Sequence, residues 1–413
     1  MSDGVLSRRR FLGVSAASLA AAGSARAASD AVRVGVIGCG ARGFALMQAM
    51  RGCAGVRVAA ACDVYAPRRR RARAAFGVET PRHWQDLVAR NGLDAVVIAT
   101  PDHWHATMAV GAMEAGKDVY CERPMALTVR EANAFRDCAL RTGRVVQIGA
   151  QQTVQPQWQV ARELVDAGAI GQVLWSQGSY RRDTGTGGWN RPIEAGVSPD
   201  SLDWEGFLGP APRRPFSPER FFRWRKYWDY SGGLAADLHY GNLAPLVIAV
   251  GAGHPERVSA AGGVYVQDGR EAPDTFVMTA EYAAGHTIVL ASSAANQVDL
   301  PAVIRGREAT IYLEGSRVRV VADGACGEGA AGRLDGYAVP AGPRRGGRDD
   351  TARHVADWLD CIRRRAKCVC NEEVGYRAMV AVGMAIDAFR QGKTLYFDAG
   401  TRRVMASPSR VCA

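Results

Sequence analysis

The sequence predicts an α/β protein that begins with a doubly wound parallel sheet and continues into a second domain. Short β-branched runs alternate with helical patterns between residues 32 and 121, which is the order of elements in a parallel sheet. The 413 residues are 47% hydrophobic and 23% charged, which is typical of a soluble globular protein and excludes disordered and collagen-like chains. Because single cores rarely exceed about 250 to 300 residues, this length predicts at least two domains.

The first 27 residues have the pattern of an export signal. The run from Ser7 to Gly13 reads SRRRFLG, residues 11–25 are uncharged, and residues 25–27 read Ala-Arg-Ala, a small-residue cleavage site. SRRRFLG resembles the twin-arginine consensus, which implies export of a folded, cofactor-loaded protein by the twin-arginine translocation machinery. We therefore expect the mature protein in the periplasm or outside the cell. No later stretch reaches 18 uncharged apolar residues, so no membrane span is expected in the mature chain.

The net charge of +11 does not indicate a nucleic-acid partner. Residues 1–27 carry four arginines and one aspartate, a charge of +3, which leaves +8 spread over the rest of the chain. No basic helix with interleaved aromatic residues is present. The ten cysteines include no Cys-x-x-Cys pair and no metal-ligand spacing. We therefore expect no metal and no disulfide framework, with Cys326 and the group Cys361, Cys368 and Cys370 as the exceptions.

A glycine-rich turn between a strand and a helix predicts a dinucleotide site. The run 32–37 is β-branched, residues 38–43 read GCGARG, and an apolar helical stretch follows through Met50. Such glycines allow the backbone to approach a pyrophosphate at the helix N-terminus. The next strand ends on Asp63, 20 residues beyond Gly43, where a carboxylate binds the ribose hydroxyls of NAD. NADP stays an alternative, because the positive charge of Arg68 or Arg69 could compensate the negative charge of a 2′-phosphate beside Asp63. The cofactor-binding residues predicted in this turn are Gly38, Cys39, Gly40, Arg42, Gly43 and Asp63.

Two further strands, 94–100 and 117–121, end in polar runs. The first run reads TPDHWH from Thr100 to His105, and the second reads CERP from Cys121 to Pro124. Doubly wound sheets bind ligands at the carboxyl ends of their strands. A metal site at Asp102, His103 and His105 is disfavoured, because the spacing supplies no fourth ligand. The cofactor-binding residues predicted at this edge are Thr100, Pro101, His103, His105, Glu122, Arg123 and Gln151.

GCGARG, TPDHWH and CERP, in this order and spacing, resemble the Gfo/Idh/MocA oxidoreductases, the family of glucose-fructose oxidoreductase and inositol dehydrogenase. The resemblance continues through the run 227–237, YWDYSGGLAAD, and through residues 369–377 and 396–398. It implies a Rossmann domain at 28–149 and an α+β domain at 150–413 with an open, mainly antiparallel sheet. That sheet would carry a sugar site on one face and often an oligomer interface on the other, so a homodimer or homotetramer is expected. The C-terminal helix and strand are expected to return to the Rossmann domain.

Aromatic and basic residues of the second domain are candidates for the sugar site. Six of the nine tryptophans lie between residues 158 and 228, and indole rings suit stacking against sugar C–H faces. We single out Trp228, which adjoins the presumed catalytic segment, together with Tyr180 and Arg181. Residues 181–203 are expected to form a long loop, and residues 322–350 an exposed insertion.

The chain departs from the family pattern at its catalytic positions. The family's E-K-P lysine is replaced by Arg123, which can polarise an oxygen but cannot act as a base. The Asp-x-x-x-His pair becomes Asp237 followed by Gly241. On a regular helix Tyr240 lies about 60° from Asp237, whereas His239 lies about 200° round and would need an irregular helix start. The predicted catalytic group is therefore Arg123 and Asp237, with Tyr240, His239, Asp237 itself or a residue from elsewhere as the acid/base.

Three functions fit these residues. The first is an exported NAD(P)-dependent oxidoreductase that transfers hydride to or from a sugar and keeps its cofactor tightly bound and internally recycled, since little free nicotinamide is present outside the cytoplasm. The second is an NAD-using glycosidase or lyase that works by redox-neutral oxidation, elimination and reduction. The third is a non-catalytic sugar-binding protein that retains NAD.

Overall fold

The first domain is a five-stranded parallel sheet. A computed structural model describes residues 31–183, 188–315, 317–323, 338–340 and 348–408; the predicted export signal, Cys326 and most of the predicted insertion at 322–350 lie outside these residues. The sheet has the order β2-β1-β3-β4-β5, and every neighbouring pair is parallel. The predicted doubly wound sheet is confirmed. Its strands are β1 (Val32–Ile37), β2 (Val56–Cys62), β3 (Ala95–Ile98), β4 (Asp118–Glu122) and β5 (Val146–Gly149).

Helices cover this sheet because each connection between parallel strands must cross a face. The longest, α6, begins with a capping box in which Thr128 accepts a hydrogen bond from the backbone N–H of Glu131. It ends at Gly143, whose φ of 63° suits glycine. The connecting helices are α2 (Ala41–Arg51), α3 (Ala66–Phe76), α4 (Trp84–Val88), α5 (His105–Glu114) and α6 (Val129–Thr142), with a 3₁₀ turn, η2 (Asp102–Trp104), before α5.

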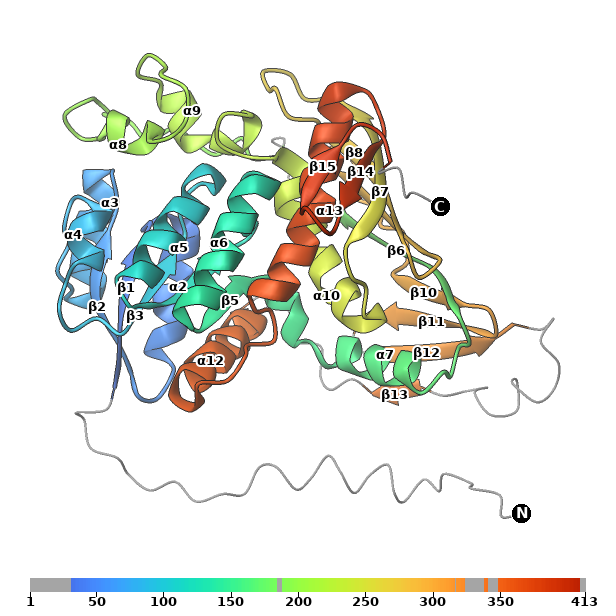
Figure 1. The fold of residues 1–413 in the computed structure, drawn as a ribbon. Helices are drawn as coiled ribbons and strands as arrows, with labels where there is room; N and C mark the ends of the chain where they lie inside the picture. Colours follow the sequence, from blue (N-terminus) through green and yellow to red (C-terminus); the bar gives the residue numbers. More distant parts are fainter. Residues whose placement is uncertain (1–30, 184–187, 316, 324–337, 341–347, 409–413) are drawn as a thin grey trace. The chain divides into compact units, whose positions relative to one another are not determined.

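The second domain contains a ten-stranded open sheet (Figure 1). Its order is β13-β12-β11-β10-β6-β9-β8-β7-β14-β15, and of its pairs only β6 with β9 is parallel, so the predicted mainly antiparallel sheet is also confirmed. Buried and more exposed residues alternate along β8 and β9, so one face packs on helices. The strands are β6 (Val173–Arg181), β7 (Pro255–Gly263), β8 (Thr275–Tyr282), β9 (His286–Ser293), β10 (Val303–Gly306), β11 (Ala309–Glu314), β12 (Arg317–Ala322), β13 (Ala338–Pro340), β14 (Leu395–Asp398) and β15 (Arg403–Met405).

Helices between the two sheets join them into one compact unit. The C-terminal helix α13 contacts α6 of the first domain and α10 and β7 of the second. Helix α12 buries Trp358 against the first sheet, whereas β14 pairs with β7 and so belongs to the second sheet. The remaining helices are η3 (Gln151–Val154), α7 (Pro156–Asp166), α8 (Trp204–Leu208), α9 (Pro218–Phe222), η4 (Trp224–Lys226), the π-helix η5 (Ala235–His239), α10 (Tyr240–Val250), α12 (Arg348–Arg364) and α13 (Glu372–Gln391).

The eight cysteines of the described part of the chain are all free thiols. Among the helices described, none combines the length and apolar character needed to cross a bilayer.

Candidate active site

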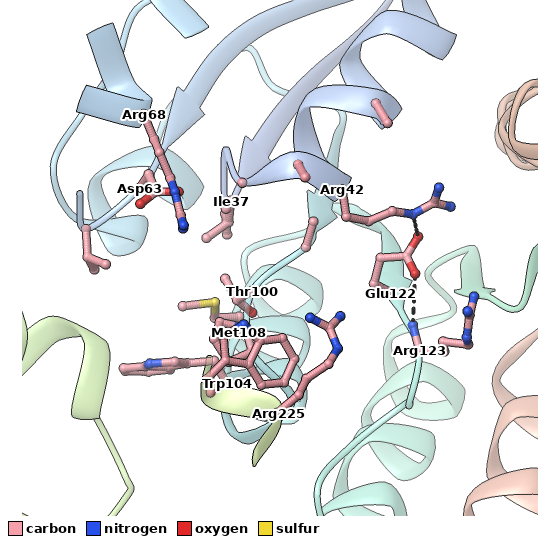
Figure 2. Close-up of a pocket in the computed structure, with 18 of the residues that line it drawn as sticks. Ile37, Arg42, Asp63, Arg68, Thr100, Trp104, Met108, Glu122, Arg123 and Arg225 are labelled. Atoms are coloured by element: carbon pink, nitrogen blue, oxygen red, sulfur yellow. Dashed lines mark hydrogen bonds and ion pairs between the residues drawn. The ribbon is translucent and has the colours of Figure 1, made fainter. Parts of the chain in front are cut away.

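A cavity of about 690 Å³ opens along the carboxyl ends of the first sheet. Its walls come from the glycine turn, from the ends of β2, β3 and β4, and from the segments of the second domain that contain β6, α8, α9, η4 and η5. Figure 2 shows side chains from both domains that line this cavity. The cavity therefore joins the predicted cofactor site to the second domain.

The glycine turn is shaped for close approach of the backbone. Gly38 has a φ of +92°, and an added Cβ would lie 2.5 Å from the carbonyl oxygen of Ala99. At Gly43 an added Cβ would lie 1.8 Å from the carbonyl oxygen of Gly38, so only glycine fits there. Gly40 is the N-cap of α2 and no side chain caps the helix, which leaves N–H groups for an anion. These features fit the pyrophosphate of NAD.

Asp63 closes the adenosine end of the cavity. Its Oδ2 accepts the backbone N–H of Cys39 at 2.7 Å, and its Oδ1 accepts that of Tyr65 at 2.9 Å. These bonds orient a buried carboxylate at the wall where ribose hydroxyls would bind. Arg68 lies 4.0 Å from Oδ2 and stacks over Phe221. Cys39 contributes only its backbone here, because its thiol is buried and hydrogen-bonds to the Cys62 carbonyl.

Glu122 anchors a network at the other side of the cavity. Its Oε1 accepts hydrogen bonds from Arg42 Nε at 2.7 Å and from Gln151 Nε2 at 2.8 Å, and its Oε2 accepts the N–H of Arg123. Figure 2 shows Glu122 between Arg42 and Arg123. The predicted residues Arg42, Glu122, Arg123 and Gln151 thus line one wall, where they hold one another in place.

The two predicted histidines of TPDHWH face away from the cavity. His103 Nε2 lies 2.9 Å from the carbonyl oxygen of Phe207, and burial lowers its pKa to about 4. His105 bridges the carbonyl oxygens of Pro124 and Thr100 at 2.6 and 2.9 Å. Both rings are buried and neither lines the cavity, so the geometry gives no support to their predicted contact with the cofactor. His105, at the start of α5, instead binds the main chain at Thr100, which lines the cavity together with Pro101.

Asp237 lies at the centre of an arginine cluster. Arg225 Nε is 3.2 Å from its Oδ2, Arg182 Nη1 is 3.5 Å from the same oxygen, and Arg123 Nη2 is 3.7 Å from Oδ1. Trp189 Nε1 donates a hydrogen bond to Oδ2 at 3.0 Å. Burial raises the pKa of Asp237, but the guanidiniums of Arg225, Arg123 and Arg182 outweigh it and hold the pKa at about 2. Asp237 is therefore a permanent anion at neutral pH and a poor base.

Arg123 itself is held by three further acceptors. Its Nε donates to the Asp237 carbonyl at 2.9 Å, and its Nη1 donates to Gln151 Oε1 at 2.9 Å and to the Gly149 carbonyl at 3.3 Å. The position of the family's lysine thus carries a rigid cation that reaches from the Rossmann domain to η5.

Neither predicted acid/base candidate of η5–α10 reaches the cavity. The Tyr240 hydroxyl is buried and donates to the Gly375 carbonyl at 2.8 Å. His239 is buried against Phe276, with ring centroids 5.5 Å apart, and burial lowers its pKa to about 3. Neither side chain is therefore placed to exchange a proton with a substrate in the cavity. Residues 235–239 form a π-helix, whose extra residue per turn changes the helical phase on which the prediction for Tyr240 depended.

The predicted sugar-site residues divide between the cavity and the outside. Tyr180 lines the cavity together with Arg182, because residues i and i+2 share a face of a strand. Arg181 points to the other face, is half exposed and pairs with Asp299 at 3.1 Å. Trp228 packs on the core beside Phe389 rather than in the cavity. The geometry therefore does not support the predicted roles of Arg181 and Trp228. Strand alternation would have favoured Arg182, and Trp189 is one of the six tryptophans noted between residues 158 and 228, whereas Arg225 had no signal in the sequence.

Both parts of the chain match models of one oxidoreductase family. Residues 32–150 match the model described as "Oxidoreductase family, NAD-binding Rossmann fold". Residues 184–319 match the one described as "Oxidoreductase family, C-terminal alpha/beta domain". Together these two matches cover more than half of the chain.

Individual relatives agree with these matches. Inositol 2-dehydrogenase 1 of Saccharopolyspora erythraea is 38% identical over 144 residues, 34% of this chain and 43% of the relative. A glycosyl hydrolase family 109 protein of the same organism is 33% identical over 208 residues, 46% of this chain and 45% of the relative. The chain spans less than half the length of the curated relatives it matches.

A solved structure shows the same fold over both domains. Levoglucosan dehydrogenase, in complex with NADH and levoglucosan, superposes with a TM-score of 0.70 at 19% identity over 88% of this chain and 98% of that chain. The glycine turn, Asp63 and the two matched domain models point to the same cofactor and the same class of enzyme. The chain therefore belongs to the Gfo/Idh/MocA family of oxidoreductases, with an NAD-binding Rossmann domain followed by the family's C-terminal α/β domain.

Proposed function

We propose that the protein is an exported NAD-dependent oxidoreductase that transfers hydride to or from a hydroxyl-bearing carbon of a sugar or sugar derivative. The observation that carries this proposal is the single cavity that joins the NAD turn to Arg123 and Asp237. The sugar substrate is supported by relatives named inositol 2-dehydrogenase and levoglucosan dehydrogenase. NAD, when bound, supplies the hydride acceptor.

Arg123 is the proposed electrostatic group of the reaction. It is held by Asp237, Gln151 and Gly149, so its charge is already oriented before a substrate arrives. A fixed cation stabilises the negative charge that develops on a substrate oxygen as its proton leaves. Asp237 orients Arg123, Arg182 and Arg225 and, with a pKa of about 2, takes up no proton near neutral pH.

Tyr180 is our candidate acid/base: its phenol donates a proton to the substrate oxygen in the reduction, and its phenolate accepts that proton in the oxidation. It lines the cavity together with Arg182, which directly follows β6, and a tyrosine hydroxyl can exchange a proton with a substrate hydroxyl. Among the described residues that line the cavity, the only histidine is His83, which lies beside Asp203, and none is a lysine.

Residues 1–27 support the export part of the proposal. A protein exported with its cofactor meets little free NAD, so the cofactor would stay bound and be reset by a second substrate. We also expect a homodimer or homotetramer, formed through the sheet face that exposes Trp175 and Val277.

A second candidate function is a redox-neutral glycosidase or lyase. The 33% identity to a glycosyl hydrolase family 109 protein over 208 residues favours it. In such a reaction the hydride returns to the same substrate after elimination, so no second sugar is needed.

The test is to analyse the nucleotide carried by the purified protein and then follow absorbance at 340 nm with a panel of sugars. A rise in absorbance that a ketose reverses supports hydride transfer between sugars. Release of an aglycone without net redox supports the second candidate. Nucleotide binding without turnover on any sugar would leave a non-catalytic sugar-binding protein, and failure to bind NAD would contradict all three functions.

A further inference from the structure

The part of the cavity around Asp237 carries far more positive than negative charge. Arg123, Arg182 and Arg225 lie within 4 Å of the Asp237 carboxylate, and Arg191 also lines the cavity. Three guanidiniums therefore surround this carboxylate, and a fourth lines the same cavity. Guanidiniums stay charged at every pH of interest, so these five side chains together carry a net charge of +3 when no ligand is bound.

The described residues do not neutralise this excess. Within the described chain, Arg182 and Arg225 both pair with Asp237, and Arg225 also contacts the face of Trp224. The buried Asp102 interacts with Arg225, but burial raises the pKa of Asp102 to about 7, so it offsets at most one positive charge. Burial lowers the pKa of Arg191, and the positive charges of Arg225 and Arg182 lower it further. Each guanidinium has five N–H donors, and the contacts to Asp237 use only part of them.

This cluster is separate from the residues that suit the phosphates of NAD. The pyrophosphate belongs to the turn between β1 and α2, where Arg42 is already paired with Glu122. Arg123 directly follows β4, Arg182 directly follows β6 and Arg225 lies in η4, and the three meet at Asp237. Figure 2 shows Arg225 and Arg123 entering the cavity from different sides, away from Asp63 and Arg68.

A neutral sugar would leave this charge uncompensated. Bringing like charges together in a partly buried site is unfavourable unless a counter-charge arrives. A carboxylate or phosphate matches the planar, bidentate donor pattern of guanidinium groups. An anionic ligand would thus complete the site, whereas a neutral polyol would use only its hydrogen bonds.

We propose that the substrate is an anionic sugar derivative, whose carboxylate or phosphate binds Arg182 and Arg225 while Arg123 contacts the reacting hydroxyl. This inference rests on the proposed oxidoreductase function and narrows its substrate class. Arg191, at the exposed end of the cluster, would make a longer-range contribution.

The first experiment uses the unmodified protein loaded with NAD. Turnover at 340 nm and binding by titration calorimetry are compared for matched pairs: galacturonate with galactose, gluconate with glucitol, and glucose 6-phosphate with glucose. We expect at least about a tenfold higher kcat/KM or affinity for one class of anion, because charge-assisted bonds exceed neutral ones. Comparison of the two carboxylates, galacturonate and gluconate, with glucose 6-phosphate identifies which anion is recognised.

Two substitutions at adjacent positions, the last residue of β6 and the residue after it, form the matched control. Arg182→Gln should raise KM for the preferred anion at least about tenfold, with KM for neutral sugars little changed. Arg181 lies on the outer face of the strand and pairs with Asp299. Arg181→Gln should therefore leave KM unchanged for the anion and for the neutral sugars. NAD affinity and the thermal midpoint are measured in both variants, which separates loss of the anion contact from loss of the fold.

The outcomes separate a failure of the anionic-substrate proposal from a failure of the proposed oxidoreductase function. Equal or better kcat/KM for neutral sugars would overturn the anionic substrate and leave the oxidoreductase intact. Binding of none of the anions would also overturn it, whatever the neutral sugars do. Failure to bind NAD would overturn the proposed function itself.

Discussion

Gly241 and Arg123 are complementary: a Cβ added to Gly241 would lie 3.4 Å from Arg123 Nε. In the family pattern the position of Gly241 carries histidine, and the position of Arg123 carries lysine. A larger side chain at position 241 would compete for the space that the guanidinium fills. The two positions that depart from the family pattern are therefore neighbours, and the Arg123 guanidinium lies beside the position where the pattern has an imidazole.

This coupling predicts a non-additive double substitution. Gly241→His should lower kcat/KM by about tenfold or more, because the imidazole displaces Arg123. Adding Arg123→Lys should recover part of the lost kcat/KM. We expect a coupling energy of about 1 kcal/mol or more, because the effects of substitutions at residues in contact are rarely additive. Steady-state kinetics of the four proteins measures the coupling. Gly253→His, at a position with open space around it, is the control; strict additivity would contradict the coupling.

Asp63 should decide between NAD and NADP. Asp63→Asn removes the charge that repels a 2′-phosphate but keeps one acceptor oxygen. The Kd for NAD should rise about tenfold, because a charge-assisted hydrogen bond is lost, while the Kd for NADP should fall with help from Arg68. Titration calorimetry with both nucleotides tests this. An unchanged ratio of the two Kd values would show that Asp63 does not contact the ribose.

Tyr180 and Tyr240 form a pair with opposite expectations. Tyr180→Phe should lower kcat by about 100-fold, within the usual contribution of a general acid or base, and should spare NAD binding. Tyr240→Phe should keep full turnover but cost about 1 kcal/mol of unfolding free energy, because it breaks the bond to the Gly375 carbonyl. Loss of turnover in Tyr240→Phe, in a protein that still binds NAD, would restore Tyr240 as a catalytic residue.

Buried histidines should make the protein less stable as the pH falls below about 6.5, where free histidine becomes protonated. Burial lowers the pKa of His239 and His354 to about 3 and that of His103 and His286 to about 4. The unfolded chain binds these protons first, so the unfolding free energy decreases between about pH 6.5 and pH 4, by up to about 1.4 kcal/mol per pH unit for each histidine.

Urea unfolding at a series of pH values tests this dependence. His239→Gln should make the curve shallower over the same interval, because one proton fewer is taken up on unfolding. An unchanged slope would mean that His239 titrates normally in the folded protein.

The export prediction is tested by replacing the two arginines at the start of SRRRFLG. Arg8→Lys together with Arg9→Lys should keep the charge but abolish export, since the twin-arginine route reads this pair as an address. Fractionation of cells that express the full chain, compared with Lys substitution of Arg26 alone, gives the measurement. Continued export of the double variant would place the protein on another route.

The sequence by itself predicted the parallel sheet, the NAD turn and Asp63, because these depend on local spacing. The local pattern is a β-branched run, three glycines and a carboxylate at the end of the next strand, and few backbone conformations satisfy it. Gly38 and Gly43 lie so close to neighbouring backbone atoms that no side chain fits at either position. The antiparallel sheet of the second domain was predicted through family resemblance, since its strands pair across distances that no local pattern encodes.

The tertiary structure alone decided which residues meet around the reacting group. The π-helix at 235–239 turned His239 and Tyr240 into the core, which a regular helical wheel does not foresee. Trp189, Arg182 and Arg225 reach Asp237 from a loop, a strand end and a 3₁₀ turn. A cluster assembled from such separate segments depends on how the second domain packs on the first, so its excess of positive charge became visible only in three dimensions.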